Sequence, residues 1–556
     1  MASKLDALRI DRSEIVNHHL DELAAGRLSR REFMRRGAAV GMSSTFIAAA
    51  LAACGGANSS PSSASSAAGA AKKGGTLKLA AQTPTAAINP MTIADLGGST
   101  MLTQTGEFLT FDNGATRRLE PMLATSWSHN GDGTVWTFKL RKGVKFHNGK
   151  TMTADDVVYT FKQQTDPKNA SNALSTFTGV LKPDGVVKVD PYTVAFHLES
   201  ANGNFPYIIS SDNYNLIIVP SGTDFAKWQR TFVGTGPFKL QSYTQNQSAH
   251  FVANPDHWGG PPHLSATSFD FYAGQQAMIL ALQGGQVDVV SQFAPQGAEA
   301  LLKNSTYKII KVQSASHREL SMRNDMAPFT DARVRQAIAL SLDRPAMVQA
   351  LLAGDGQVGN DSPFAPKFAS TNTSVPQRTQ DIAKAKALLS AAGHPNGFTT
   401  TLTTGQQEEI ATLAQVIAQS AAKIGVKINL KVETLSAYYG KATYGNSDWL
   451  DAIMSLVEYG DRGVPNVFLE APLQSNGPWN AARFKNKTYD SLVKQYVAAV
   501  DLQTQRSIAG KIERLLLAQT PLVIPYFVDI LAATSSHVGG VQVNGFAIFL
   551  GKAYLT

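Results

Sequence analysis

The chain contains a single cysteine, Cys54, in 556 residues. One thiol cannot form an intramolecular disulfide. Cys54 closes the small-residue segment LAAC at 51–54, whose first three residues end an uncharged stretch at 37–53 and which precedes a Gly-, Ser- and Ala-rich stretch at 55–75. Its position divides the chain into a leader, a linker and a body that begins near residue 76.

The leader, residues 1–53, has the layout of an export signal. A basic segment, SRREFMR at 29–35, precedes the apolar stretch and the small-residue exit. The apolar stretch is too short and too rich in Gly, Ala and Ser to be a good membrane span. Arg30 and Arg31, with Phe33 and Arg35, resemble a twin-arginine signal, which exports folded cargo; a general secretory signal is the alternative.

The segment LAAC resembles a bacterial lipobox, in which the cysteine becomes the lipidated first residue. The lipid is attached as a thioether, so the resemblance makes Cys54 the lipidation site. Each buried CH₂ of the lipid contributes ~0.8 kcal/mol, so several acyl chains anchor a protein stably. The alternative is a buried cysteine behind an ordinary cleavage site. We expect an exported, membrane-anchored lipoprotein that faces the periplasm or cell exterior, with residues 54–75 as a flexible tether.

The body has the composition of an ordinary globular protein. Hydrophobic residues make up 43% and charged residues 17% of the chain, which is enough for a sizeable core. The formal charge of +8 is spread along the sequence, and no basic block is interleaved with aromatic residues. This pattern argues against nucleic acid as a partner.

The densest secondary-structure pattern lies at 123–164. Asp132-Gly133 is a hairpin signal before a β-rich segment at 135–140. Thr153 and Asp156 form a capping-box pattern at the start of a helix that Asp166-Pro167 ends. Further strands are expected at 76–82 and 107–112, and a further hairpin at 186–200.

From about residue 410 the pattern alternates between helix and strand. The periodicity predicts a helix over 410–425, a strand over 426–432, an apolar strand within 449–465, a helix over 506–521 and strand-like structure over 545–556. This alternation is typical of an α/β fold.

Five segments occur in an order and at a spacing that together identify a family. They are GTGPFKL at 234–240, NPDHWGGPP at 254–262, ALQGGQVDVV at 281–290, APFTDARVRQAIALSLDR at 327–344 and DIAKAKALLSAAGHPNGF at 381–398. They resemble extracellular solute-binding protein family 5, the peptide- and nickel-binding proteins of ABC importers. The resemblance covers roughly residues 76–556.

This resemblance implies a two-lobed α/β fold of the periplasmic-binding-protein type II class with an extra β-rich insert domain. The expected parts are the signal at 1–53, the tether at 54–75, a discontinuous lobe I at 76–110, 232–316 and 530–556, the insert domain at 111–231, and lobe II at 317–529.

The resemblance also implies a function: a substrate-binding lipoprotein of an ABC importer that captures oligopeptides or similar solutes between hinged lobes. Its partners are then a peptide or small-molecule ligand, the membrane subunits of an ABC transporter, and the membrane through the lipid anchor. A nickel chelate or another non-peptide solute is the alternative ligand.

The sequence carries no enzyme signature. It has no GxSxG or HExxH motif, no phosphate-binding GKS or GKT loop, and no second cysteine for a zinc pair. We therefore expect a protein that is not an enzyme, with no catalytic residues, no cofactor and no bound metal. A secreted hydrolase and a signalling or chaperone-like surface lipoprotein are the rival classes.

Asp461 is the first candidate for ligand binding. It follows the apolar strand within 449–465, and ligands of open α/β sheets bind at the carboxyl ends of strands. EYGDRGVPNVF at 458–468 resembles the family segment whose acid accepts the ammonium group of a bound peptide, and Asp461 matches that acid. An exposed turn aspartate is the alternative. In the empty protein we expect this side chain to lie in water.

Other candidates are aromatic or polar. Tyr438, Tyr439, Tyr459 and Trp479 are expected either to line a ligand pocket or to pack in the core. His317 lies near the expected crossing between the lobes, where a surface histidine is a commoner outcome than a metal ligand.

Two departures from the family pattern concern specificity. Val464 and Asn466 stand where peptide-binding relatives usually carry further acids. The segment 401–409 also lacks the arginine with which dipeptide-binding relatives hold the peptide carboxylate. The resemblance therefore does not imply strict dipeptide specificity.

Overall fold

The computed structural model describes residues 71–116, 118–407 and 409–556. The predicted leader and most of the tether, with Arg30, Arg31 and Cys54, lie outside the described residues. In the described ranges, no helix is both long enough and apolar enough to cross a membrane.

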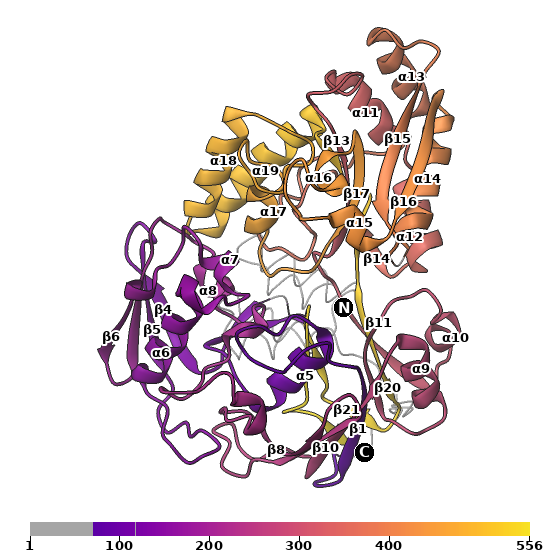
Figure 1. The fold of residues 1–556 in the computed structure, drawn as a ribbon. Coiled ribbons are helices and arrows are strands. Elements are labelled where there is room, and N and C mark those ends of the chain that lie inside the picture. Colours follow the sequence, from indigo (N-terminus) through magenta and orange to yellow (C-terminus); the bar gives the residue numbers. More distant parts are fainter. Residues whose placement is uncertain (1–70, 117, 408) are drawn as a thin grey trace, which may run out of the picture. The chain divides into compact units, whose positions relative to one another are not determined.

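Among the described residues, one sheet has seven strands that come from distant parts of the sequence (Figure 1). In spatial order they are β12 (Tyr307–Val312), β20 (Ile530–Ser535), β11 (Val289–Phe293), β1 (Thr76–Gln82), β10 (Ala266–Tyr272), β9 (Ser248–Ala253) and β8 (Phe238–Thr244). β1 pairs in parallel with β10 and β11, and the other neighbours are antiparallel. The expected strand at 76–82 is confirmed as β1.

A second sheet draws its strands from the chain between 317 and 528. Its spatial order in the described part of the chain is β14 (Gly356–Val358), β19 (Tyr526–Val528), β13 (His317–Met322), β17 (Met454–Tyr459), β15 (Phe398–Gly405) and β16 (Val426–Glu433), with β18 (Leu522–Val523) beside β13. β15 pairs in parallel with both β16 and β17, as helix-connected strands do.

Helices bury their apolar sides against this second sheet. α14 (Ile410–Ala422) places Leu413 and Ile417 in a core with Leu402 and Leu456. The same core takes side chains from α11 (Ala332–Leu340), α12 (Arg344–Leu352) and α13 (Ile382–Ala391). The predicted helix at 410–425 and strand at 426–432 are therefore confirmed to within a few residues.

The chain at 124–197 forms a four-stranded sheet with a helix beside it. The strands are β4 (Ala124–His129), β5 (Val135–Leu140), β7 (Thr193–His197) and β6 (Val186–Asp190), in that spatial order, and the helix is α6 (Ala154–Thr165). Thr153 and Asp156 make the capping box at the start of α6, and the chain leaves the helix at Asp166. These local predictions are confirmed because a hairpin and a cap depend on residues close in sequence.

Two helices near the carboxyl end, α18 (Lys487–Ala498) and α19 (Leu502–Gln519), pack together. Tyr489, Tyr496 and Ile512 join a core cluster rich in aromatic residues that also reaches the second sheet through Tyr459. The predicted helix at 506–521 is confirmed as α19, although it begins earlier, with Asp501 as its N-cap.

Three predicted strands differ from the structure. The predicted strand within 449–465 is confirmed as β17, but it begins only at Met454. The short helix α16 (Asp448–Asp451) precedes it, and Asp451 Oδ2 accepts hydrogen bonds from the N–H groups of Gly445 and Ser447 in the turn before that helix. The expected strand at 107–112 is shortened to β2 (Thr110–Asn113). The run at 545–556 contributes only the two-residue strands β23 (Ile548–Phe549) and β24 (Tyr554–Leu555).

A buried ion-pair group links the segment between β14 and α13 to the second sheet. Asp361 is 0% exposed and receives two hydrogen bonds from Arg344 Nη2, at 2.7 and 2.8 Å. Arg378 Nη1 lies 2.6 Å from Asp361 Oδ2, and the N–H of Ile524 donates to Oδ1 at 3.2 Å. This carboxylate therefore joins α12, its own loop and the distant chain at Ile524 between β18 and β19.

Candidate functional site

Asp461 follows β17 and is almost completely buried, with 4% of its surface exposed. Its Oδ1 accepts a hydrogen bond of 2.6 Å from the N–H of Ala315, in the segment that connects the two large sheets. Both carboxylate oxygens also accept hydrogen bonds from Lys367 Nζ, each at 2.9 Å. The expectation that Asp461 lies in water in the empty protein is wrong, because its own chain covers and pairs it.

Close backbone approach explains how the carboxylate becomes so enclosed. A Cβ placed on Gly545 would lie 2.4 Å from Asp461 Oδ2, a distance that real side chains do not show. Glycine at 545 therefore lets the carboxyl-terminal segment lie directly against the carboxylate.

The loop between β14 and α13 positions Lys367. Phe364 and Phe368 on either side of it are buried in the same core cluster as Tyr459. Within the loop, Thr371 Oγ1 donates to the carbonyl of Ala365 at 2.6 Å, and the N–H of Phe368 donates to the same carbonyl at 3.0 Å. These contacts fix the backbone around Lys367, whose side chain is only 11% exposed.

Two further aspartates, Asp112 and Asp212, lie near Lys367 and come from a different part of the chain. Asp112 lies on β2, and Asp212 follows the short helix α8 (Phe205–Ile208). The N–H of Asp112 donates to Ser211 Oγ at 2.9 Å, and the N–H of Ser211 donates to the carbonyl of Thr110 at 3.0 Å, which holds the two segments together. A Cβ on Gly463 would lie 3.0 Å from Asp212 Cγ and 3.3 Å from Asp112 Oδ2, so both aspartates approach the segment after β17.

We call Asp112, Asp212, Asp461 and Lys367 the charged cluster. Burial raises the pKa of Asp112 to about 7, although Lys367 opposes the shift. Burial likewise raises the pKa of Asp212. Burial alone would lower the pKa of Lys367, but Asp461, Asp112 and Asp212 outweigh it and raise that pKa. Lys367 is therefore an ammonium beside two carboxyl groups, Asp112 and Asp212, that burial makes reluctant to ionise.

The raised pKa of Asp112 predicts a pH dependence of stability. Between the ordinary value of 3.8 and about 7, the folded protein binds more protons at Asp112 than the unfolded chain, so stability falls as pH rises through this window. The substitution Asp112→Asn mimics the protonated acid with a neutral amide. We expect the thermal midpoint of this variant to exceed that of the parent at pH 8 and to match it closely at pH 4.5. Parallel midpoint curves for the two proteins across this range would contradict the assignment.

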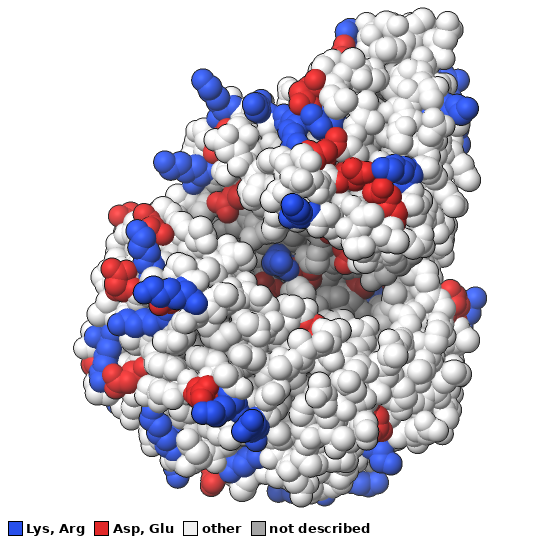
Figure 2. Space-filling view, viewed as in Figure 1, with Lys and Arg blue, Asp and Glu red and all other residues white. Residues whose placement is uncertain are grey.

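Beside the charged cluster lies a cleft of about 490 Å³, lined by residues from the segments 172–215 and 462–497 and by Phe546. Polar groups on its walls include Asp212, Asn213, Asn466 and Gln474, and apolar ones include Val464, Val467 and Phe546. Figure 2 shows a hollow on the viewed face in which both basic and acidic side chains are visible. A cleft with mixed walls and a few charged groups suits a small amphipathic solute.

Arg462 is the basic residue of this cleft that neighbours Asp461. Its Nη1 donates to the carbonyl of Asp461 at 2.6 Å, and its guanidinium lies 5.7 Å from the ring centroid of Phe546. The pKa of Glu470, across the lining, is raised by burial. Burial thus raises the pKa of both Asp212 and Glu470, and Arg462 contributes a guanidinium to the same lining.

The predicted aromatic candidates lie in the aromatic core cluster or pack against it. Tyr438 is 1% exposed and donates its hydroxyl hydrogen bond to the carbonyl of Leu456 at 2.9 Å. The rings of Tyr459 and Trp479 stack at 5.9 Å, and Tyr439 packs edge-on against Tyr438. Their ligand contacts stay a prediction.

His317 is fully buried at the start of β13. Its Nδ1 lies 2.8 Å from the carbonyl oxygen of Ala315, and its ring contacts Tyr459, Phe468 and Phe527. The described residues contain no group of three or more His, Cys, Asp or Glu side chains arranged to hold a metal ion. Because the His317 side chain is fully buried, the expectation of a surface histidine is wrong.

Sequence reasoning missed Lys367, Asp112 and Asp212. Lys367 is 94 residues from Asp461, and no local motif marks any of the three. The sequence offered only the apolar residues Phe364 and Phe368 on either side of Lys367, which indicate that the loop is anchored and say nothing of its ion pair.

Sequence relatives cover most of the chain. A family model described as bacterial extracellular solute-binding proteins, family 5 Middle, matches residues 118–477. Heme-binding protein A of Haemophilus influenzae is 28% identical over 447 residues, which make up 74% of this chain and 79% of that protein. The dipeptide-binding protein of Escherichia coli is 25% identical over 458 residues, 77% of this chain and 84% of that protein.

Solved structures show the same fold. The binding protein DppA of Helicobacter pylori, in complex with the peptide STSA, superposes with a TM-score of 0.68 at 25% identity, over 87% of this chain and 98% of that one. HbpA2 of Haemophilus parasuis gives a TM-score of 0.76 at 24% identity, over 86% of this chain and 99% of that one. These likenesses confirm the predicted two-lobed α/β fold of the periplasmic-binding-protein class.

Proposed function

Because the chain belongs to the bacterial extracellular solute-binding proteins of family 5, and so is the binding component of an ABC importer, we propose that its ligand is a peptide or a peptide-like solute. The E. coli and H. pylori relatives are named for peptides or contain one. The ligand lies in the cleft beside the charged cluster, between the segment at 172–215 and the segment at 462–497.

The polar lining of that cleft carries the proposal. Amide side chains of Asn213, Asn466 and Gln474 offer donors and acceptors that match a peptide backbone, while Val464 and Val467 give apolar contacts. Arg462 offers a guanidinium to a carboxylate or a carbonyl of the ligand. Main-chain recognition of this kind binds peptides of varied sequence.

The test combines identification and titration. Native mass spectrometry of freshly purified protein should show a retained solute of peptide mass, and calorimetry against a tetrapeptide pool should detect binding. Replacing Arg462 by glutamine should weaken binding by about tenfold or more, as expected for the loss of a hydrogen bond to a charged group.

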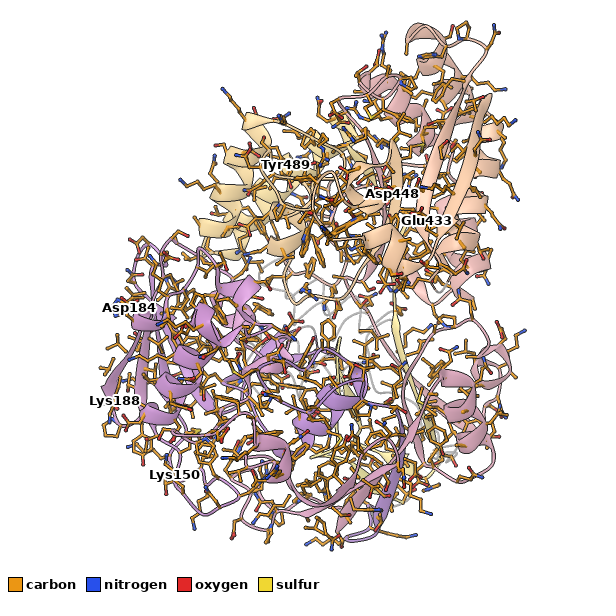
Figure 3. All side chains as sticks on the ribbon, in the orientation of Figure 1. Lys150, Asp184, Lys188, Glu433, Asp448 and Tyr489 are labelled. Carbon is orange, nitrogen blue, oxygen red and sulfur yellow. The ribbon has the colours of Figure 1, made fainter. Side chains whose placement is uncertain are left out.

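Lys188→Gln is the matched control, because Lys188 lies on β6 of the four-stranded sheet with its side chain 39% exposed (Figure 3). The control should bind the pool as the parent does. Retention of a nickel chelate or another non-peptide solute, together with no peptide binding, would contradict the peptide proposal and leave the family membership unchanged.

Membrane anchoring through Cys54 is part of the proposed function. A lipid on Cys54 and the tether behind it hold the body at a membrane surface. Cys54→Ser removes the thiol that carries the lipid, so we expect a folded protein that fractionates as soluble. If the variant sediments with membranes as completely as the parent, the anchor lies elsewhere.

Export by the twin-arginine route rests on the segment at 29–35. Changing Arg30 and Arg31 together to lysine keeps the charge of the segment and removes the arginine pair. We expect processed protein to disappear from the membrane fraction and the precursor to accumulate inside the cell. An unchanged yield of processed protein would instead indicate the general secretory route.

A further inference from the structure

Lys367 places an ammonium group of the chain itself on Asp461, the residue that the family resemblance assigns to a ligand's ammonium. Its Nζ is 2.9 Å from both carboxylate oxygens, which is a two-point contact. The N–H of Ala315 occupies Oδ1 at 2.6 Å as well. With 4% of Asp461 exposed, a second ammonium has no free face of this carboxylate to approach.

The backbone around the pair keeps it closed. Gly545 lies so near that a Cβ would sit 2.4 Å from Asp461 Oδ2, and Arg462 lies over the carbonyl of the same residue. Lys367 is itself anchored by its neighbours Phe364 and Phe368, both of which are buried. The lysine is therefore built into the site and does not reach it as a loose surface side chain.

The charges around Lys367 also favour its position beside Asp461. Asp112 and Asp212 attract its ammonium across the site, so three carboxyl groups of the described chain share one lysine. The cleft beside them carries the guanidinium of Arg462. A ligand ammonium could bind Asp461 only by displacing Lys367. Lys367 would then lose both of its hydrogen bonds to the carboxylate while it stays largely buried, which is unfavourable.

We infer that Lys367 determines the class of ligand: it supplies from within the chain the ammonium that Asp461 binds, so the protein accepts solutes that present no free amino terminus at this position. Peptides with a blocked amino end, and peptide-like solutes whose polar groups are amides, meet this condition. The inference rests on the proposed function for the location of the ligand, while the Lys367–Asp461 pair itself can be tested without any peptide.

The first test titrates matched peptides. A tetrapeptide pool and the same pool with acetylated amino ends are measured against the parent, Lys367→Met and Lys367→Arg. The parent and Lys367→Arg, which keep the internal cation, should bind the acetylated pool at least as tightly as the free pool. Lys367→Met should shift the ratio toward the free amine by about tenfold or more, the size expected of one charge-assisted contact.

The second test replaces the missing side chain by a small amine. Lys367 lines a cavity of about 660 Å³ together with Thr116, Arg118 and Pro366, so the truncation in Lys367→Ala leaves room for a small amine. Butylammonium chloride should then raise the thermal midpoint of Lys367→Ala above its value in sodium chloride at the same concentration. It should leave the parent and a Lys188→Ala control unchanged.

The outcomes separate the two proposals. Rescue of Lys367→Ala by butylammonium without peptide binding by any variant supports the role of Lys367 and contradicts the peptide ligand. A parent that prefers the free-amine pool tenfold, or that butylammonium stabilises as much as Lys367→Ala, overturns the inference. Absence of rescue together with an unchanged peptide ratio in Lys367→Met overturns it as well.

Discussion

Replacing Asp361 by alanine should lower the free energy of unfolding by about 3–5 kcal/mol, the usual cost of removing one partner from a buried ion pair. Asp361 is 0% exposed, Arg344 beside it is 1% exposed and Arg378 is 10% exposed. Among the described residues, Arg344 Nε and Nη1 have no hydrogen-bond partner, so the compensation of its charge depends on Asp361. Chemical denaturation of the parent and the variant measures the difference.

The matched control is again Lys188→Gln, which breaks the exposed pair with Asp155. Exposed pairs contribute at most about 1 kcal/mol, because water and salt screen them. A loss at Asp361→Ala as small as that of the control would show that the arginines find other partners. Arg344→Met combined with Asp361→Ala should recover part of the loss, because it removes the buried guanidinium that has lost its carboxylate, although Arg378 still lacks Asp361.

The contrast between correct and incorrect predictions follows the distance over which the determining interactions act. The cap of α6 depends on Thr153 and Asp156, three residues apart, and the sequence pattern predicted it correctly. The run within 449–465 mixes apolar residues with Asp451, Ser455 and Glu458, and its composition alone does not distinguish a short helix from a strand. Contacts from Asp451 to the preceding turn decided that part, and no periodicity reports them.

Long-range contacts also decided the part of the charged cluster that the sequence did not predict. The sequence placed Asp461 at the end of an apolar strand, and the structure has it after β17. Its exposure depended on Lys367, Ala315 and Gly545, which approach only when the two large sheets and the carboxyl-terminal segment are assembled. A turn-like composition predicts exposure for an aspartate, and long-range pairing overrides that tendency.

Replacing Asp461 by alanine should destabilise the empty protein by roughly 3 kcal/mol, the lower end of the range for a broken buried pair. Lys367 loses both of its hydrogen bonds to carboxylate oxygens but keeps Asp112 and Asp212 nearby, which limits the loss. The N–H of Ala315 also loses its acceptor. The measurement is the free energy of unfolding without ligand, at a pH above 7 where Asp112 is largely ionised.

The double variant Lys367→Met with Asp461→Ala distinguishes the possible causes of this loss of stability. If the cost of Asp461→Ala comes from an unpaired ammonium, removing that ammonium should recover most of the stability, and the two single changes should be strongly non-additive. If the cost comes from the cavity or from Ala315, the double variant should be no more stable than Asp461→Ala. Recovery would show that Lys367 and Asp461 stabilise the empty protein mainly by pairing with each other, because each single change then costs stability by leaving the other charge unpaired.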